Sequence, residues 1–182
     1  AGTLDVYMTN EAGCSYCDDN TYDNQASCES YGSSDGGITK DGVWSFDATI
    51  DETTCELDAT NGDYFDGKVG GFQFQLLGIK VTGASGGTAE DVGFSISTSE
   101  TTTSADGDTP TPSVLAFSLS GATIPIGSNA VLTQITFSDF DGIGICFGED
   151  TGQTGANVIS DSAGKYINTN WAECTCESAS PA

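Results

Sequence analysis

The sequence contains no histidine and no arginine, and its only basic side chains are four lysines. Without histidine the chain lacks the commonest general base and cannot form a Ser-His-Asp or Cys-His arrangement. Without arginine it has no bidentate clamp for phosphate or carboxylate substrates. A carboxylate pair of the glycosidase type remains conceivable, but 27 acidic residues supply such a pair by chance. We therefore predict that the protein is not an enzyme.

Positive charge is too scarce to balance the acidic side chains. The formal net charge is -23 in 182 residues, so a strong negative field surrounds the protein at neutral pH. This field disfavours nucleic acid as a partner, because phosphate binding draws on Lys and Arg. It suits divalent cations, cationic partners or a saline habitat, or it only keeps a secreted protein in solution.

Long apolar runs are also missing. No run reaches the roughly 20 residues that a helix needs to span a bilayer, so we expect no membrane span. Seven cysteines in a chain without histidine indicate an oxidising compartment, where disulfides persist. We therefore predict an extracellular or cell-surface protein.

The cysteine spacing leaves two uses open. Cys14-x-x-Cys17 and Cys174-x-Cys176 have the short spacing of zinc ligands, but the redox setting favours disulfides. Cys174 and Cys176 lie on the same face of an extended segment, so one can reach Cys146 while the other is left over. Cys176 is then a free thiol or a bridge to another chain. The predicted bridges are Cys14–Cys55, Cys17–Cys28 and Cys146–Cys174.

Apolar residues at every second position predict strands. Phe72, Phe74 and Leu76 alternate with Gln73 and Gln75, which predicts a half-buried strand. Similar runs separated by Gly, Ser, Asn or Pro occur at 4–9, 94–97, 115–119, 131–137, 143–147 and 158–160, the last leading into a turn at 161–164. The pattern predicts an all-β protein built as a β-sandwich.

The segment 11–66 holds few aliphatic residues, so we expect disulfides rather than apolar burial to fix its loops. Alternation from Trp44 to Ile50 predicts one strand that returns to the sandwich, and DNQASCES predicts one helical turn. We expect a single domain, 1–182, made of a first strand (1–10), a cysteine-rich insertion (11–66), a sandwich core (67–176) and a tail (177–182).

Several motifs stand in the order found in a known family. GFQFQL, a VTGASGG turn, GFSIS, LAFSLSGATIPIGSNAVLTQITF and VISDSAGK resemble the cohesin-like modules of secreted and cell-surface bacterial proteins. The resemblance covers residues 69–165, and LDVYMT is similar to the family's first strand, whereas the segment 11–66 departs from the plain pattern. It implies a jelly-roll or immunoglobulin-like sandwich of about nine strands that binds proteins or sits in surface assemblies. No dockerin-recognition motif is visible.

The loop between residues 97 and 114 has no core-forming residue. Its dense Thr, Ser and Pro are typical of an O-glycosylated segment, or equally of a flexible loop. No Asn-x-Ser/Thr sequon occurs in the chain, so N-linked glycans are not expected. The candidate glycosylation sites are Thr101, Thr102, Thr103, Thr109 and Thr111.

Asp and Asn cluster in DATNGDYFD, and such oxygen-rich loops suit Ca²⁺. The cluster does not fit the spaced calcium-loop motif, and Asp, Asn and Gly also dominate turns for backbone reasons. Ca²⁺ is the only cofactor considered. Its candidate ligands are Asp58, Asn61, Asp63 and Asp66.

Two functions remain open. The first is a structural subunit of an extracellular filament that assembles head to tail, in which Leu4, Val6 and Met8 of the first strand fill a groove in the next subunit. Alternatively, the strand completes its own sandwich, as the first strand does in cohesin-like modules. The second is a monomeric, cohesin-like binding module that presents a sheet face with exposed aromatic side chains to a protein or carbohydrate.

Overall fold

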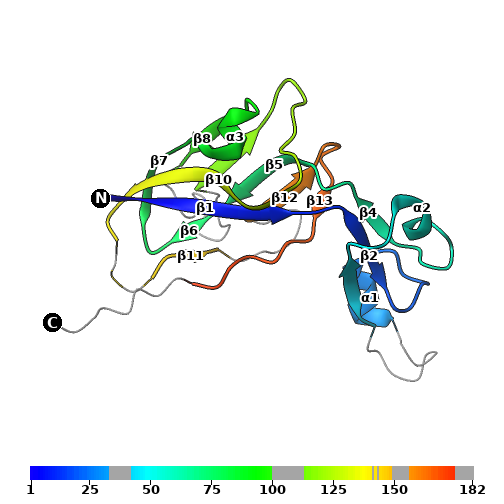
Figure 1. Cartoon of the computed structure of the whole chain (residues 1–182). Coiled ribbons are helices and arrows are strands. Elements are labelled where there is room, and N and C mark those ends of the chain that lie inside the picture. The colour runs from blue at the N-terminus through cyan, green and yellow to red at the C-terminus, as the bar shows by residue number, and fades with distance from the viewer. Residues whose placement is uncertain (33–41, 100–112, 141, 143, 149–155, 175–182) are drawn as a thin grey trace. The chain divides into compact units, whose positions relative to one another are not determined.

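The computed structural model describes residues 1–32, 42–99, 113–140, 142, 144–148 and 156–174 (Figure 1). The chain divides into two compact units. Unit 1 comprises Ala1–Thr9 and Val69–Ala182, and unit 2 comprises Asn10–Lys68. The sequence pattern predicted a single domain with a cysteine-rich insertion at 11–66. No helix in the described ranges is long and apolar enough to cross a bilayer.

Unit 1 is mostly β-structure. A five-stranded sheet has the order β13-β12-β5-β9-β8, a three-stranded sheet the order β1-β10-β7, and β11 pairs with β6. The elements are β1 (Gly2–Asn10), β5 (Val69–Phe74), β6 (Leu76–Leu77), β7 (Lys80–Ser85), α3 (Gly87–Asp91), β8 (Ser95–Thr98), β9 (Val114–Phe117), β10 (Gly127–Ser138), β11 (Cys146–Phe147), β12 (Val158–Asp161) and β13 (Tyr166–Ile167). The several antiparallel sheets agree with the predicted β-sandwich class.

The inner face of the five-stranded sheet supplies much of the core. Opposite residues of an antiparallel pair point to the same face, and Phe72 stands opposite both Ala116 and Ile159. These three side chains are at most 6% exposed. Phe74 is fully buried, and its ring stacks on Phe72 with the centroids 5.9 Å apart. The strand predicted from Phe72 and Phe74 is thus confirmed, but it ends at Phe74, and Gln75, expected on the polar face, is only 5% exposed.

A buried asparagine holds the point where β5 gives way to β6. The Asn157 side chain is fully buried; its Oδ1 accepts the Gln75 backbone N–H at 2.8 Å, and its Nδ2 donates to the Gly148 carbonyl. The Gly148 N–H donates to the Gln75 carbonyl at 3.0 Å. An unpaired buried backbone group is costly. Asn157 avoids this cost by pairing with the backbone groups of Gln75 and Gly148, where β5 ends and β6 begins.

Unit 2 has its own small sheet. The strands β2 (Gly13–Cys17), β3 (Trp44–Asp47) and β4 (Asp63–Phe65) pair in the order β3-β2-β4. Two short helices accompany them, α1 (Gln25–Tyr31) and α2 (Glu52–Cys55). The helical turn predicted in DNQASCES is confirmed by α1, which the Asn24 side chain caps by accepting the Ser27 N–H.

The core of unit 2 consists of cystine. Among its described hydrophobic side chains, the fully buried ones are Cys14, Cys17, Cys28 and Cys55, each at most 2% exposed. They form the bridges Cys14–Cys55 and Cys17–Cys28. Unit 2 therefore depends on its disulfides where unit 1 depends on aromatic and aliphatic packing.

Three expectations about strands were wrong. The Trp44 strand does not return to the sandwich; it pairs with β2, because the two cystines give unit 2 a core of its own. The VTGASGG segment lies largely in β7, which pairs with β10, so it is not simply a turn. The strand expected at 115–119 ends at Phe117, and Leu119 is 87% exposed in the turn that follows.

Candidate functional site

The candidate assembly strand is β1, an edge strand that hydrogen-bonds to β10. Its side chains alternate as the sequence predicted. Val6 is buried at 6% exposure and Leu4 and Met8 are half-buried, whereas Asp5 and Tyr7 are exposed. The apolar edge of β1 therefore faces the core of unit 1.

Three contacts fix how β1 lies on β10. Gln134 Nε2 donates to Asp5 Oδ1 at 2.9 Å, and the Asn129 N–H donates to Thr9 Oγ1 at 2.9 Å. A Cβ added at Gly2 would lie 2.8 Å from the tip of the Phe137 ring, so Gly2 lies against Phe137. Residues later in β1 meet residues earlier in β10. The two strands therefore run antiparallel.

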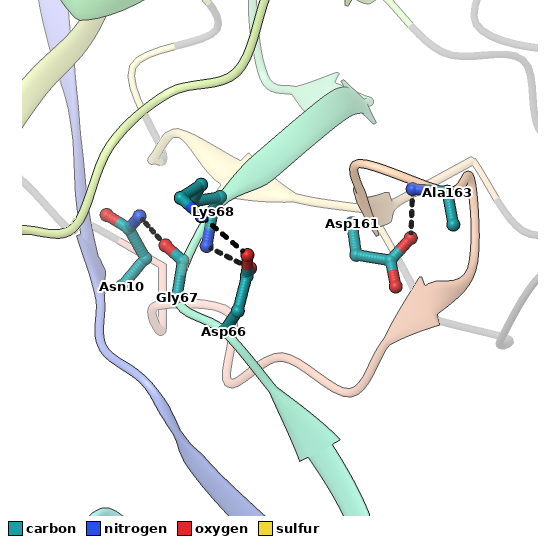
Figure 2. A network of polar contacts seen from close by, with 6 residues as sticks. All are labelled: Asn10, Asp66, Gly67, Lys68, Asp161 and Ala163. Carbon is teal, nitrogen blue, oxygen red and sulfur yellow. Dashed lines mark hydrogen bonds and ion pairs between the residues drawn. The ribbon is translucent and has the colours of Figure 1, made fainter. Parts of the chain in front are cut away.

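The two ends of unit 2 are tied to each other within that unit. Asn10 Nδ2 donates to the Gly67 carbonyl at 2.6 Å, and Asn10 is only 8% exposed (Figure 2). Gly67 has a φ of 82°, a left-handed conformation that glycine adopts without strain. The chain thus enters and leaves unit 2 at neighbouring points.

Asp66 and Lys68 flank this junction. Asp66 Oδ1 accepts the Lys68 N–H, and Asp66 Oδ2 pairs with Lys68 Nζ, each at 2.9 Å (Figure 2). The Lys68 side-chain hydrogen bond lowers the pKa of Asp66, and the Asp66 carboxylate raises the pKa of Lys68. Both side chains are about half exposed, so solvent screens the pair and it adds little stability.

Unit 1 contains the third predicted bridge, Cys146–Cys174. All three bridges match the pairings expected from the sequence. Cys174 is exposed, unlike the cystines of unit 2. The turn predicted after β12 is present: Asp161 Oδ1 accepts the Ala163 N–H at 2.8 Å (Figure 2). The same oxygen accepts the Lys165 N–H at 2.8 Å.

The candidate calcium ligands engage protein groups. Asp66 is held by Lys68 as described, the Asn61 amide donates to the Asn20 carbonyl at 2.9 Å, and the Asn20 amide donates to the Asp58 carbonyl at 3.1 Å. These are bonds of the kind that shape turns. In the described part of the chain the carboxylates of Asp58, Asp63 and Asp66 do not form a close group of three, and calcium stays a prediction.

One group of three metal-ligating side chains does lie close together in the described part of the chain: Cys17, Asp18 and Cys28. The two sulfurs are bonded to each other as a disulfide and offer no thiolate. This arrangement therefore does not serve as a zinc site. The glycosylation candidates and Cys176 lie outside the described residues.

The carboxylates with shifted pKa values have structural causes. The Thr54 backbone N–H lowers the pKa of Asp51, the N-cap of α2, and the Thr49 hydroxyl lowers that of Asp47. Asp51 is exposed and Asp47 is half-buried, and the two carboxylates hold a helix end and a turn. The shifts therefore mark local structure and give no sign of acid-base chemistry.

Comparison with known proteins finds no family model, no curated protein and no solved structure that matches the chain significantly. The similarity to cohesin-like modules thus rests on the sequence motifs described above. Sequence reasoning missed the residues that connect β1 to β10, chiefly Asp5 and Gln134, because 129 positions separate them in the chain. It also missed Asn10, whose single side chain carries no pattern.

Proposed function

We propose that this protein is a non-enzymatic extracellular structural subunit that assembles head to tail by donating β1 to the next subunit. The observation that supports this most is the position of β1. It is an edge strand with an apolar inner side, and the whole of unit 2 separates it in sequence from the rest of unit 1.

This connectivity favours exchange. Because unit 2 lies between Thr9 and Val69, β1 can leave its place without breaking the pairing among the remaining strands of unit 1. A second copy offers the same partners, Gln134 and Asn129, and the same apolar surroundings for Val6. The donated strand would then gain main-chain bonds and bury Val6 and its neighbours as in strand addition. Repetition of this contact builds a fibre, unless a rotation closes a ring.

The disulfides support an extracellular location. Three cystines persist in oxidising surroundings and are rare in a reducing cytosol. The dense negative charge would keep exposed subunits soluble. O-linked glycans on the loop at 97–114 belong to the same proposal.

A cross-link between β1 and β10 tests strand donation. In a Cys176→Ser background, Asp5→Cys and Gln134→Cys place two thiols on side chains that touch. A short bifunctional thiol reagent then joins them in the native assembly. Thr82→Cys with Thr136→Cys is the matched control, since these hydroxyls lie 3.2 Å apart on β7 and β10. Both control residues come from one segment of unit 1, so they must react within one chain.

Strand donation predicts a covalent ladder on a denaturing gel for the first pair and a single-chain band for the control. A single-chain band for both pairs would mean that β1 completes its own sandwich, and the donation mechanism would be wrong. In that case the monomeric cohesin-like binding module becomes the better function.

A further inference from the structure

Among the residues that the structure describes, the strands of the five-stranded sheet place no charged side chain on its outer face, although the protein is acidic. Register places its outward residues in rows: Phe117 lies beside Ser95 on one side and Gly71 on the other, and Leu115 lies beside Ser97 and Gln73. We call the following set the uncharged face: Gly71, Gln73, Ser95, Ser97, Leu115, Phe117, Val158, Ser160 and Tyr166.

Two large apolar side chains stand at the centre of this face. Leu115 and Phe117 are each 38% exposed, although β9 is an inner strand of the sheet whose alternate residues, Val114 and Ala116, are fully buried. The charges nearest in sequence are Asp161 at the end of β12, whose carboxylate accepts the Ala163 and Lys165 N–H groups, and the exposed Lys165, which precedes Tyr166. The face is therefore an apolar centre with a hydroxyl and amide surround.

From this charge pattern we infer that the uncharged face is a reversible contact between two copies of this chain. Two copies, each with a net charge of -23, repel one another. A contact through the uncharged face sets no carboxylate of its own against another and removes Leu115 and Phe117 from water. A cationic partner would gain no electrostatic attraction from a surface without carboxylates. The uncharged face therefore suits a partner that is itself acidic, and a second copy of this chain, with its net charge of -23, is such a partner.

The size of the face sets the strength of the contact. Five strands spaced about 4.8 Å apart, with about four residues of 3.3 Å each, cover roughly 300 Å². A stable pairwise interface buries about 800 Å² on each partner. A single contact is therefore weak and in rapid exchange. It becomes effective where many copies are aligned side by side, as lateral contacts between filaments.

Sedimentation equilibrium of the whole chain, from about 0.02 to 1 mM at low and high NaCl, tests this inference; salt at about 1 M shortens the screening length to about 3 Å. We expect the association constant to rise with salt, because screening removes repulsion and no ion pair is lost. Phe117→Asp should lower it about tenfold or more at high salt. Ser95→Asp adds a charge to the same face without removing apolar packing, and should act likewise.

Ser128→Asp is the matched control, because Ser128 is an exposed residue of β10 outside the uncharged face. It should leave the association constant within about twofold of the unaltered chain's value. No association of the unaltered chain at 1 M salt, or equal association of Phe117→Asp and Ser128→Asp, would overturn the inference. So would capture of a Lys-rich peptide by the face without self-association. If the chain is polymeric, electron micrographs separate the two mechanisms: the face controls bundle width, and β1 controls filament length.

Discussion

Reduction of the disulfides should unfold unit 2 while unit 1 stays folded. The perturbation acts on the core itself, since the buried hydrophobic side chains described in unit 2 are the four bridged cysteines. Unit 1 keeps Phe72, Phe74 and the other buried apolar residues whether or not Cys146–Cys174 is intact.

The magnitude follows from the loops that the bridges close. Cys14–Cys55 spans 41 residues and Cys17–Cys28 spans 11, which in the chain-entropy relation corresponds to about 4 and about 3 kcal/mol. Together these are of the same order as the roughly 5–15 kcal/mol that stabilises a whole domain. A unit without an aliphatic core has little else to oppose unfolding once both bridges are open.

Hydrogen exchange read by mass spectrometry is the assay. After reduction and alkylation, peptides from Asn10–Lys68 should lose protection, while β5, β9 and β12 retain it. The double variant Cys146→Ser with Cys174→Ser is the control, because it opens only the bridge of unit 1 and should leave unit 2 protected. Protection of unit 2 that survives complete reduction would refute the cystine-core argument.

Four further predictions extend these expectations. Gly62→Ala should destabilise unit 2 by about 1–3 kcal/mol, because its Cβ would lie 2.5 Å from Cys14 Sγ; thermal unfolding of unit 2 measures this. Val6→Asp should prevent β1 from docking, whereas Tyr7→Asp, on the exposed side, should not, and assembly by light scattering separates them. The pKa of Asp51 is lower in the folded protein than the value of 3.8 expected in the unfolded chain. The ionised Asp51 carboxylate therefore stabilises unit 2 at pH values above 3.8, and this stabilisation is lost as the pH falls through the folded pKa. Asp51→Asn keeps a cap and should flatten the acid dependence of unit 2 as the pH falls below 3.8. If Asp58, Asn61, Asp63 and Asp66 bind calcium, removing it with a chelator should lower the melting temperature of unit 2; an unchanged value would end that prediction.

The fold was predictable where one side chain in two is buried. Phe72 and Phe74, Val6 on β1, and the turn at Asp161 all lie as their patterns indicated, because alternation reports a sheet with one buried face. The prediction that the strand continues to Leu119 was wrong. Leu119 is apolar and continues the alternation, so the pattern does not indicate the turn in which it lies.

Other features lie outside what a local pattern can report. The spacing of the cysteines in GCSYC gives no sign of a strand. Cys14 and Cys17 nevertheless lie in β2, the central strand of the sheet of unit 2. Asn157 holds Gln75 across 82 positions, and no spacing rule connects them. Partner choice over such distances is decided by packing of the whole unit rather than by the residues of one segment.

Whether β1 docks in its own chain or in a neighbouring chain cannot be predicted from the sequence, and the reason is energetic. The same contacts, from Asp5 with Gln134 to Thr9 with Asn129, form whether β1 comes from its own chain or from a neighbour. Their free energies therefore cancel in the comparison. What remains is the effective concentration of a chain's own strand, millimolar for a short flexible tether, set against the concentration of subunits and any strain in the connection through unit 2. The alternation of Leu4, Val6 and Met8 determines neither quantity.

Strand donation should therefore depend on the concentration of subunits: the cross-linked ladder between β1 and β10 should lengthen as the subunits are concentrated before linking. A single-chain band that stays constant at every concentration would assign β1 to its own sandwich.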